Sequence, residues 1–431
     1  MTIGLVALAL LLLLCFFGIR IGFATLLVGV CGIAMLRGWS PAFTMLMQQV
    51  LEEGKNYNLS VIPMFIAMGV FIYRSDVSKD LFDAAYMSLG KFRGGLAHST
   101  ILACAGFSAV CGSSVATAAT MSKVAMTPMR QYKYDDGFAA GTIAAGGTLG
   151  IMIPPSVPLV IYGVIAEQDV GLLFMAGVLP GLLLVALFLL TIVVLMRLRP
   201  SLAPMDEKIQ IEDRRKVTRA VIPILGLFVL VLGGIYLNLF TPTEAAGIGA
   251  FGSAIIAILR GRLRTFREWR DALVETGKTS SALFIVIFGA LVFAQLINLS
   301  GMPQELLTAV KGLALGPMGL VGVIIIIALL MGMVFEAIGI ILLLIPIFLP
   351  SLQASNIDMI WFGIIVVLVT ELGLITPPVG MNVFVVKSVV DNISLNSIFR
   401  GVTPFIFAML IGLALILVFP PIATLLPTMM K

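Results

Sequence analysis

The chain has 431 residues, of which 60% are hydrophobic and 11% are charged, and its mean hydropathy is +1.12. About a quarter of the residues of a soluble globular protein are charged, so this composition excludes a soluble domain and indicates a polytopic integral membrane protein. The formal net charge of +5 does not indicate nucleic-acid binding in such a protein. The positions of the basic residues instead indicate which loops face the cytoplasm, because Lys and Arg collect on that side of the membrane.

Twelve apolar segments follow one another along the chain, and most have the length of one bilayer crossing, about 20 residues. Segments 95–129 and 318–350 are too long for one crossing and carry weak helix formers near their middles. This pattern predicts two helical hairpins that enter and leave the bilayer on the same side. The full set is 2–17, 21–36, 58–73, 95–129, 138–165, 171–196, 220–238, 244–259, 279–298, 318–350, 358–390 and 403–427.

Two of these segments contain consecutive prolines, Pro154-Pro155 and Pro377-Pro378. Each pair removes two backbone donors and forces the preceding residue out of the α region, so we predict a helix break in mid-membrane at both places. The surrounding motif recurs at an offset of 223 residues, which takes Gly150 to Gly373. Interrupted segments at matching positions of two halves are typical of transporters built from internal repeats.

Equivalent loops of the two halves differ in charge. The loop at 260–278 has six Lys and Arg, whereas its equivalent at 37–57 has two, balanced by two acids. The bias is reversed for 74–93, with four, and 297–316, with one. The repeats are therefore predicted to be inverted, with about ten crossings, two hairpins and the N-terminus outside. The loops predicted to be cytoplasmic are 74–93, 130–133, 197–219, 260–278 and 387–400.

The predicted fold is an all-α polytopic membrane protein made of two inverted repeats, each with five crossings, a re-entrant hairpin and a broken helix. We expect scaffold helices at the start of each repeat, followed by a transport part and an arm helix that also belongs to the scaffold. The expected divisions are 1–94 (first scaffold helices), 95–170 (first transport part, with hairpin and broken helix), 171–219 (scaffold arm helix and cytoplasmic linker), 220–317 (second scaffold helices), 318–390 (second transport part, with hairpin and broken helix) and 391–431 (C-terminal scaffold arm helix).

A hairpin tip that meets a broken helix exposes backbone groups that lipid cannot satisfy. Unwound carbonyls suit a monovalent cation and helix N-termini suit an anion, whereas a divalent cation would need several carboxylates. The polar groups at the first tip and break are hydroxyls and carbonyls, so sodium is the predicted ion. The offset of 223 also places Ser113, at the first tip, on Glu336, at the second.

Few charged or titratable side chains lie within the predicted spans. Glu336 is a candidate neighbour of the ion or of the substrate, and Glu371 is either functional or a neutral structural acid. Lys123 either reaches the interface or contacts a charged substrate, and His98 is expected to contact headgroups or loop backbone. Glu244 is expected in a helix N-cap turn, and the four cysteines in apolar stretches favour neither disulfides nor a metal site.

Four motifs in order resemble the large membrane subunit (DctM-like) of tripartite ATP-independent periplasmic (TRAP) transporters: Cys111-Gly-Ser-Ser-Val-Ala-Thr-Ala-Ala-Thr120, Gly146-Gly-Thr-Leu-Gly-Ile-Met-Ile-Pro-Pro155, Thr241-Pro-Thr-Glu-Ala-Ala246 and Gly373-Leu-Ile-Thr-Pro-Pro-Val-Gly380. The resemblance implies an elevator-type fold related to divalent-anion sodium symporters, in a bacterial inner membrane. It also implies Na⁺-driven uptake of an organic acid such as a C4-dicarboxylate, sialic acid or another sugar acid. The implied partners are a small four-helix membrane (Q) subunit, not fused to this chain, and a periplasmic substrate-binding (P) protein.

The resemblance further implies two Na⁺ sites and a substrate site between them, with no organic cofactor. Cys111 stands where a small polar residue is expected, which leaves its backbone carbonyl as the sodium ligand. The first sodium site would use Ser113, Gly150, Ile153, Pro155 and Cys111; the second would use Phe335, Ala337, Gly373, Thr376 and Met381. The substrate site would use Ser114, Ser156 and Glu336, with Thr117 and Asn382 available beside them.

Two alternatives stay open at this point. One is a stand-alone carboxylate symporter of the divalent-anion type, coupled to protons or sodium, with Glu336 and Glu371 as proton carriers. The other is an intramembrane enzyme or respiratory subunit. Haem or quinone chemistry usually needs paired histidines, and this sequence has one histidine, so the transporter is the favoured interpretation.

Overall fold

The computed structural model describes residues 2–204, 214–312 and 316–430, and these are helical with short connections and no strands. The first repeat contains nine of the α-helices and one short 3₁₀ helix before the long helix α10. Their bounds are α1 (Thr2–Phe16), α2 (Ile21–Arg37), α3 (Trp39–Gly54), η1 (Tyr57–Ser60), α4 (Val61–Arg74), α5 (Val77–Leu89), α6 (Gly95–Cys111), α7 (Ser114–Gln131), α8 (Asp136–Met152), α9 (Val157–Ile165), α10 (Val170–Leu198) and η2 (Pro200–Leu202).

The second repeat reproduces this order. Helices α14 to α19 begin within two residues of the positions that the 223-residue offset gives for α5 to α10. The bounds are α11 (Arg214–Tyr236), α12 (Pro242–Leu259), α13 (Phe266–Leu299), α14 (Met302–Gly312), α15 (Pro317–Gly332), α16 (Ala337–Ala354), α17 (Met359–Gly373), α18 (Met381–Val389), α19 (Leu395–Val418) and α20 (Pro421–Met430). The two-repeat prediction is confirmed at the level of individual helices.

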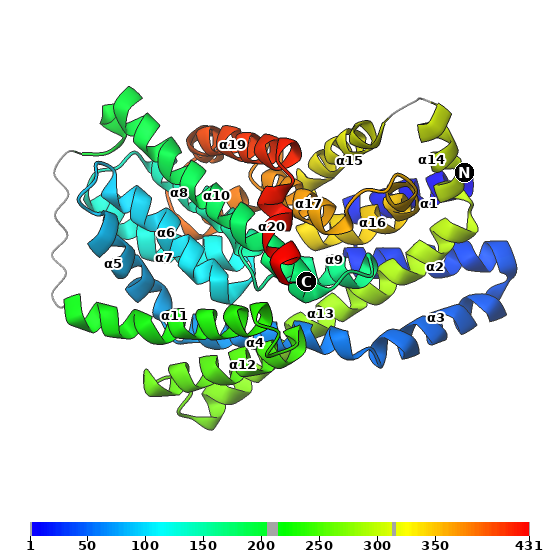
Figure 1. The fold of residues 1–431 in the computed structure, drawn as a ribbon, viewed down its shortest axis with the longest axis horizontal. Helices are drawn as coiled ribbons and strands as arrows, with labels where there is room; N and C mark the ends of the chain where they lie inside the picture. Colours follow the sequence, from blue (N-terminus) through cyan, green and yellow to red (C-terminus); the bar gives the residue numbers. More distant parts are fainter. Residues whose placement is uncertain (1, 205–213, 313–315, 431) are drawn as a thin grey trace.

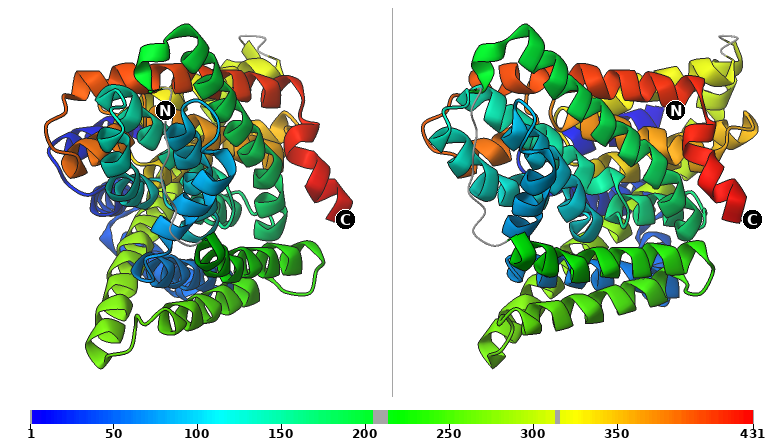
Figure 2. Two further views of the ribbon diagram at one scale, coloured as in Figure 1. Left: turned by 90° about the vertical axis from the view of Figure 1, so that its left-hand side faces the viewer. Right: turned by 60° about the vertical axis from the view of Figure 1, so that its left-hand side comes forward.

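The helices form two groups that pack against each other. In Figure 1 the helices α3, α4, α11 and α12 run along the lower side and α13 rises from them across the molecule, and the hairpins and broken helices lie above. Helix α2 of the first repeat packs on α13 of the second, and α12 of the second repeat packs on α4 of the first. Each repeat therefore packs against helices of the other. Figure 2 shows α11, α12 and the start of α13 beneath the rest of the molecule in both turned views.

The two hairpins and the two broken helices are present where the sequence predicts them. The hairpin of α6 and α7 turns at Gly112 and Ser113, and the hairpin of α15 and α16 turns at 333–336. Helices α8 and α9 meet at an angle of 42° across 153–156, and α17 and α18 are separated by 374–380. Both Pro-Pro bonds in these breaks are cis.

Seven helices of the described residues are long and apolar enough to cross a bilayer, and the bent pair α8–α9 would make an eighth. About ten crossings were expected. The difference lies in short apolar helices such as α2, with 17 residues, and α17, with 15.

Element boundaries differ from the sequence prediction in several places. Helix α13 begins at Phe266, well before 279, because Thr265 and Glu268 form a capping box that starts the helix in the basic loop. Helix α19 ends at Val418 and α20 begins at Pro421, because Pro420 and Pro421 interrupt the segment expected at 403–427. The loops expected at 37–57, 74–93 and 297–316 contain the helices α3, α5 and α14.

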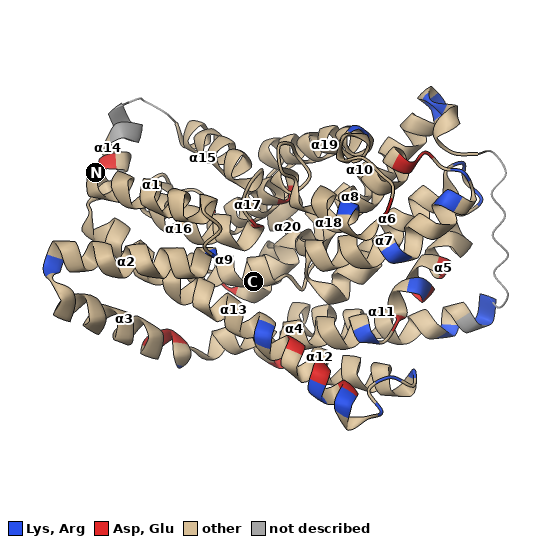
Figure 3. Cartoon of the chain, turned by 180° about the vertical axis from the view of Figure 1, so that it is seen from behind, with Lys and Arg blue, Asp and Glu red and all other residues tan. Residues whose placement is uncertain are grey.

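Basic residues gather toward one end of the molecule. Figure 3 shows Lys and Arg around α5, the start of α11 and the α12–α13 connection, and few at the opposite end beyond Arg37, which ends α2. This distribution is the one expected of a multi-span membrane protein whose basic end faces the cytoplasm.

Candidate functional site

The backbone of the first hairpin tip leaves the helical conformation between α6 and α7. Cys111 ends α6, and Gly112 takes φ +64°, a left-handed conformation that favours glycine. Ser113 then caps α7, and its Oγ accepts a hydrogen bond from the Ala116 amide at 3.4 Å. A Cβ on Gly112 would lie 2.7 Å from the carbonyl oxygen of Pro155, so the tip rests directly on the break of the first broken helix.

The first broken helix meets this tip backbone to backbone. A Cβ at Gly150 would lie 2.6 Å from the Ser113 carbonyl oxygen, a distance that side chains do not tolerate. Beyond the break, Ser156 caps α9 by accepting a hydrogen bond from the Leu159 amide at 3.5 Å. The structure thus brings Cys111, Ser113, Gly150 and Pro155 of the predicted first sodium site together, with Ile153 in the same break.

The second broken helix also meets its hairpin through a glycine, but at the end of α15, four residues before the position equivalent to Ser113. A Cβ at Gly373, the equivalent of Gly150, would lie 2.5 Å from the carbonyl carbon of Gly332 at the end of α15. The Phe335 amide donates to the Met331 carbonyl at 2.8 Å, and Glu336 is the N-cap residue of α16, which starts at Ala337. In the break, Thr376 Oγ1 donates to the Leu372 carbonyl at 2.6 Å, and Met381 starts α18.

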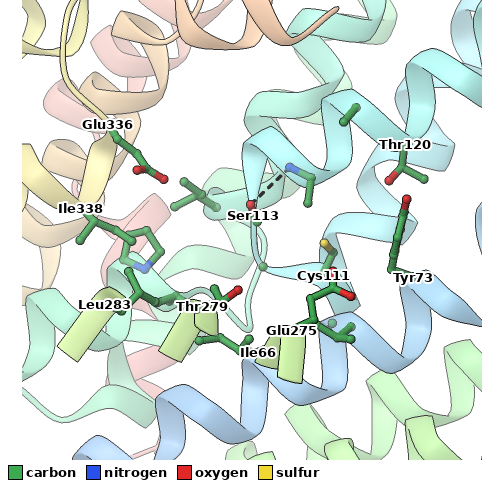
Figure 4. A pocket seen from close by; sticks show the side chains of 18 residues that line it. Ile66, Tyr73, Cys111, Ser113, Thr120, Glu275, Thr279, Leu283, Glu336 and Ile338 are labelled. Carbon is green, nitrogen blue, oxygen red and sulfur yellow. Dashed lines mark hydrogen bonds between the residues drawn. The ribbon is translucent and has the colours of Figure 1, made fainter. Parts of the chain in front are cut away.

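A cavity of about 390 Å³ lies between the two tips and the helices α4 and α13. Figure 4 shows Glu336 and Ser113 reaching toward it from the two hairpins, with Glu275, Thr279 and Leu283 of α13 on the opposite wall. From the tip its wall continues along α7 to Ala119 and Thr120 and along α4 to Tyr73. It is lined by Ile66, Gly69, Val70, Tyr73, Cys111, Gly112, Ser113, Ala116, Ala119, Thr120, Ile151, Val157, Pro158, Glu275, Thr279, Leu283, Glu336 and Ile338.

Two carboxylates and no Lys or Arg are among the residues that line this cavity. Glu275 is neutralised by Arg74, whose Nη2 lies 2.6 Å and whose Nε lies 3.2 Å from one oxygen of the carboxylate. Glu336 has no ion-pair partner in the described part of the chain. An uncompensated carboxylate in a mostly apolar cavity is costly unless a cation or a donor neutralises it.

Of the five residues predicted to contact substrate, Glu336 lines the cavity and the other four are buried behind its wall. Ser114 donates to Glu371 at 2.6 Å, and Asn382 Nδ2 donates weakly to the Ala144 carbonyl at 3.5 Å. Three other buried side-chain oxygens have no hydrogen-bond partner among the described residues: Thr117 Oγ1, Asn382 Oδ1 and Glu371 Oε1. Ser156 is buried as the cap of α9.

Tyr73 of α4 and Glu275 and Thr279 of α13 line the cavity but were not among the site residues predicted from the sequence. Glu275 lies in a stretch assigned to a basic loop, because the extension of α13 toward the basic end was not foreseen. The signal was present in the capping box at Thr265–Glu268, which marks a helix start ten residues before Glu275.

The other charged or titratable residues discussed from the sequence lie outside the cavity lining. Thr241 and Glu244 form the expected capping box of α12, and Lys123 is exposed on α7. His98 is buried, and its Nδ1 lies 2.9 Å from the Gly94 carbonyl oxygen, so it contacts loop backbone, one of the two predicted surroundings. Arg260 and Arg262, in the connection before α13, pair with Asp80 and Asp76 respectively.

Comparison with known families decides the identity. The model of the DctM component of tripartite ATP-independent periplasmic transporters matches residues 8–422. The chain belongs to this family. It is 37% identical over 379 residues to the C4-dicarboxylate TRAP transporter large permease protein DctM of Pseudomonas aeruginosa, covering 88% of each chain. It is 31% identical to the sialic acid permease SiaM of Vibrio cholerae, covering 96% of each, and 30% identical to the ectoine permease TeaC of Halomonas elongata, covering 98% of each.

The fold of this DctM-family permease is also found in a solved structure. The YdaH transporter of Alcanivorax borkumensis, described as having an unusual topology, superposes with a TM-score of 0.69 over 88% of both chains at 15% identity. The likeness supports the helix arrangement alone. Together the relatives and the fold make this chain the large permease subunit of a TRAP transporter, a class of membrane transport proteins.

Proposed function

We propose that this permease carries an organic acid anion into the cell by symport with two Na⁺ ions. One ion would bind at each hairpin tip, at the residues named above for the two sodium sites. The anion would occupy the cavity between the tips, held by helix ends and hydroxyls, because none of the lining residues is a Lys or Arg that could clamp a carboxylate.

The observation that carries this proposal is the close backbone contact between each hairpin and the broken helix of its own repeat. The equivalent glycines Gly150 and Gly373 contact Ser113 in the first hairpin and Gly332, at the end of α15, in the second. Backbone carbonyls in such breaks are suitable ligands for Na⁺. A cation there would also offset the carboxylate of Glu336, which otherwise repels an entering anion.

We further propose an elevator motion in which the hairpins and broken helices slide past a scaffold of α2, α4, α11, α12 and α13. The segment boundaries given by the sequence stay a prediction. Helices α10 and α19 pack on α8, α9 and α17, which favours placing them with the moving group. The cavity runs along α7 and α4 toward the basic end, so this conformation would be the inward-facing one.

The named substrates of the relatives, a C4-dicarboxylate, sialic acid and ectoine, define the candidates to test first. A C4-dicarboxylate or a sugar acid fits the proposed anion site. A small four-helix membrane subunit would complete the complex in the bacterial inner membrane, and a periplasmic binding protein would deliver the substrate. The N-terminus of this chain would then be periplasmic.

The test is uptake of labelled substrate by proteoliposomes that contain the complex and its binding protein. We expect uptake to require an inward Na⁺ gradient and to vanish when choline replaces Na⁺. Uptake that runs on a proton gradient without Na⁺ would contradict the coupling. Full uptake by this chain without either partner would favour the stand-alone symporter.

A further inference from the structure

A single buried hydrogen bond joins the first hairpin tip to the second broken helix. Ser114, the first residue of α7, donates from its Oγ to Oε2 of Glu371 on α17 at 2.6 Å. Both residues are at most 1% exposed. They lie 257 positions apart in the chain and belong to different repeats, so the bond is a tertiary link and not part of either helix.

The link touches both proposed cation sites. Ser114 directly follows Ser113, whose carbonyl packs on Gly150. Glu371 lies two residues before Gly373, which packs on the end of the second hairpin. A shift of the first tip is therefore transmitted through one hydrogen bond to the helical turn that supports the second tip.

The twofold-related position has no such link. The offset of 223 residues takes Ser114 to Ala337, which has no hydroxyl group, and relates Glu371 to Thr148. The Thr148 Oγ1 donates instead to the Ala145 carbonyl of its own helix at 2.6 Å. Among the described residues, the bond between a hairpin tip and the other repeat's broken helix thus occurs at one of the two equivalent positions. A requirement of helix packing alone would apply at both.

Packing does not account for a carboxyl group at position 371. The second oxygen of Glu371 has no hydrogen-bond partner among the described residues, and the side chain is fully buried. An apolar side chain of similar volume would cost less there, since burying a carboxyl group is unfavourable unless its hydrogen bonds are satisfied. The geometry therefore points to a role beyond stability.

We propose that Glu371 is a positioning residue that couples the two cation sites through Ser114. When an ion orders the first tip, the Ser114–Glu371 bond holds the turn of α17 that forms part of the second site. The second ion then binds to a site already in place, so the ions bind cooperatively. This inference rests on the proposed Na⁺ symport.

The test is the Na⁺ dependence of uptake by the complete complex in proteoliposomes, at saturating substrate. Ser114→Ala and Glu371→Ala should each lower the Hill coefficient for Na⁺ from near two toward one and raise the half-saturating Na⁺ concentration about tenfold. The double variant should be no worse than either single one, because both remove the same bond. Glu371→Gln keeps an acceptor for Ser114 and should recover part of the cooperativity.

Thr148→Ala is the matched control, since it alters the twofold-related position without removing a link, and its Na⁺ curve should match that of the wild type. Wild-type Hill coefficients in Ser114→Ala and Glu371→Ala, or full additivity in the double variant, would overturn the proposal. If Glu371→Ala does not accumulate, Ser114→Ala and Glu371→Gln carry the test. Wild-type uptake without any Na⁺ requirement would instead refute the symport itself.

Discussion

The close contact between each broken helix and its hairpin requires a glycine, Gly150 in the first repeat and Gly373 in the second, because neither position leaves room for a Cβ atom. Each occupies a position where a Cβ would lie within 2.6 Å of the backbone of its own hairpin. The sequence motif located both glycines, because they precede the two Pro-Pro pairs at one offset. The sequence could not show what approaches them, because that contact joins segments that are far apart in the chain.

The first prediction concerns Gly150→Ala. The added methyl group would lie 2.6 Å from the Ser113 carbonyl oxygen, so the tip must move away from the broken helix. We expect Na⁺-dependent uptake to fall at least about tenfold. Forcing an extra methyl group into a packed contact costs about 1–3 kcal/mol, and about 1.4 kcal/mol corresponds to a tenfold change in binding. Gly226→Ala on α11 is the control, because nothing lies within 4 Å of its Cβ position, and it should transport normally. Normal uptake by Gly150→Ala would contradict the tip geometry.

The second prediction concerns Glu336. If a cation beside the second tip offsets this carboxylate, Glu336→Gln removes an attractive charge and should raise the half-saturating Na⁺ concentration about tenfold. Glu52→Gln, on the exposed surface of α3, should leave the Na⁺ curve unchanged. The measurement is initial uptake against Na⁺ concentration. Identical curves for Glu336→Gln and the wild type would place the carboxylate outside the ion's reach.

At the scale of elements, the sequence predicted the hairpins, the breaks and the repeat, because each leaves a local pattern of proline, glycine and apolar length. It did not predict that α13 is continuous over 34 residues while its equivalent in the first repeat is divided into α3, η1 and α4. That difference places Glu275 and Thr279 in the cavity wall. It depends on a cap at Thr265 and on packing against α2 and α4, which the apolar pattern does not report.

Arg260 and Arg262, in the connection before α13, form ion pairs with residues at the α4–α5 junction at the basic end. Arg260 donates to the Ser75 carbonyl at 2.8 Å and pairs with Asp80, and both side chains are about three-quarters buried. The 223-residue offset takes Asp76 and Asp80 to Leu299 and Pro303, so the equivalent junction has no carboxylates at these positions. These pairs therefore hold the α12–α13 connection against the start of α5.

The third prediction follows from this asymmetry. Arg260→Ala leaves Asp80 without its cation and should lower the stability of the detergent-solubilised protein by about 1–3 kcal/mol, seen as a fall of several degrees in the apparent melting temperature. Arg270→Ala is the matched control. Its partner is the neighbouring Asp271 at an exposed site, and such pairs contribute little. Equal melting temperatures for the two variants would contradict a structural role for Arg260.

At the scale of the whole molecule, composition predicted a membrane protein, loop charge predicted inverted repeats, and the repeated helix breaks predicted a transporter. None of these patterns locates the cavity, because its walls come from both repeats and from helices that are far apart in the chain. The same repeat symmetry that relates the helices predicts a second conformation, in which the moving group contacts the scaffold as the twofold-related elements do and the cavity opens at the opposite end.

The measurement that tests this account most directly is the sidedness of the cavity. Ala119 lines it and is replaced by cysteine in a variant whose native cysteines are alanine. A membrane-impermeant thiol reagent is then applied from one side or the other. The account predicts labelling from the cytoplasmic side at rest, and labelling from the periplasmic side when Na⁺ and the loaded binding protein are present. Labelling from the same side under every condition would contradict the proposed movement.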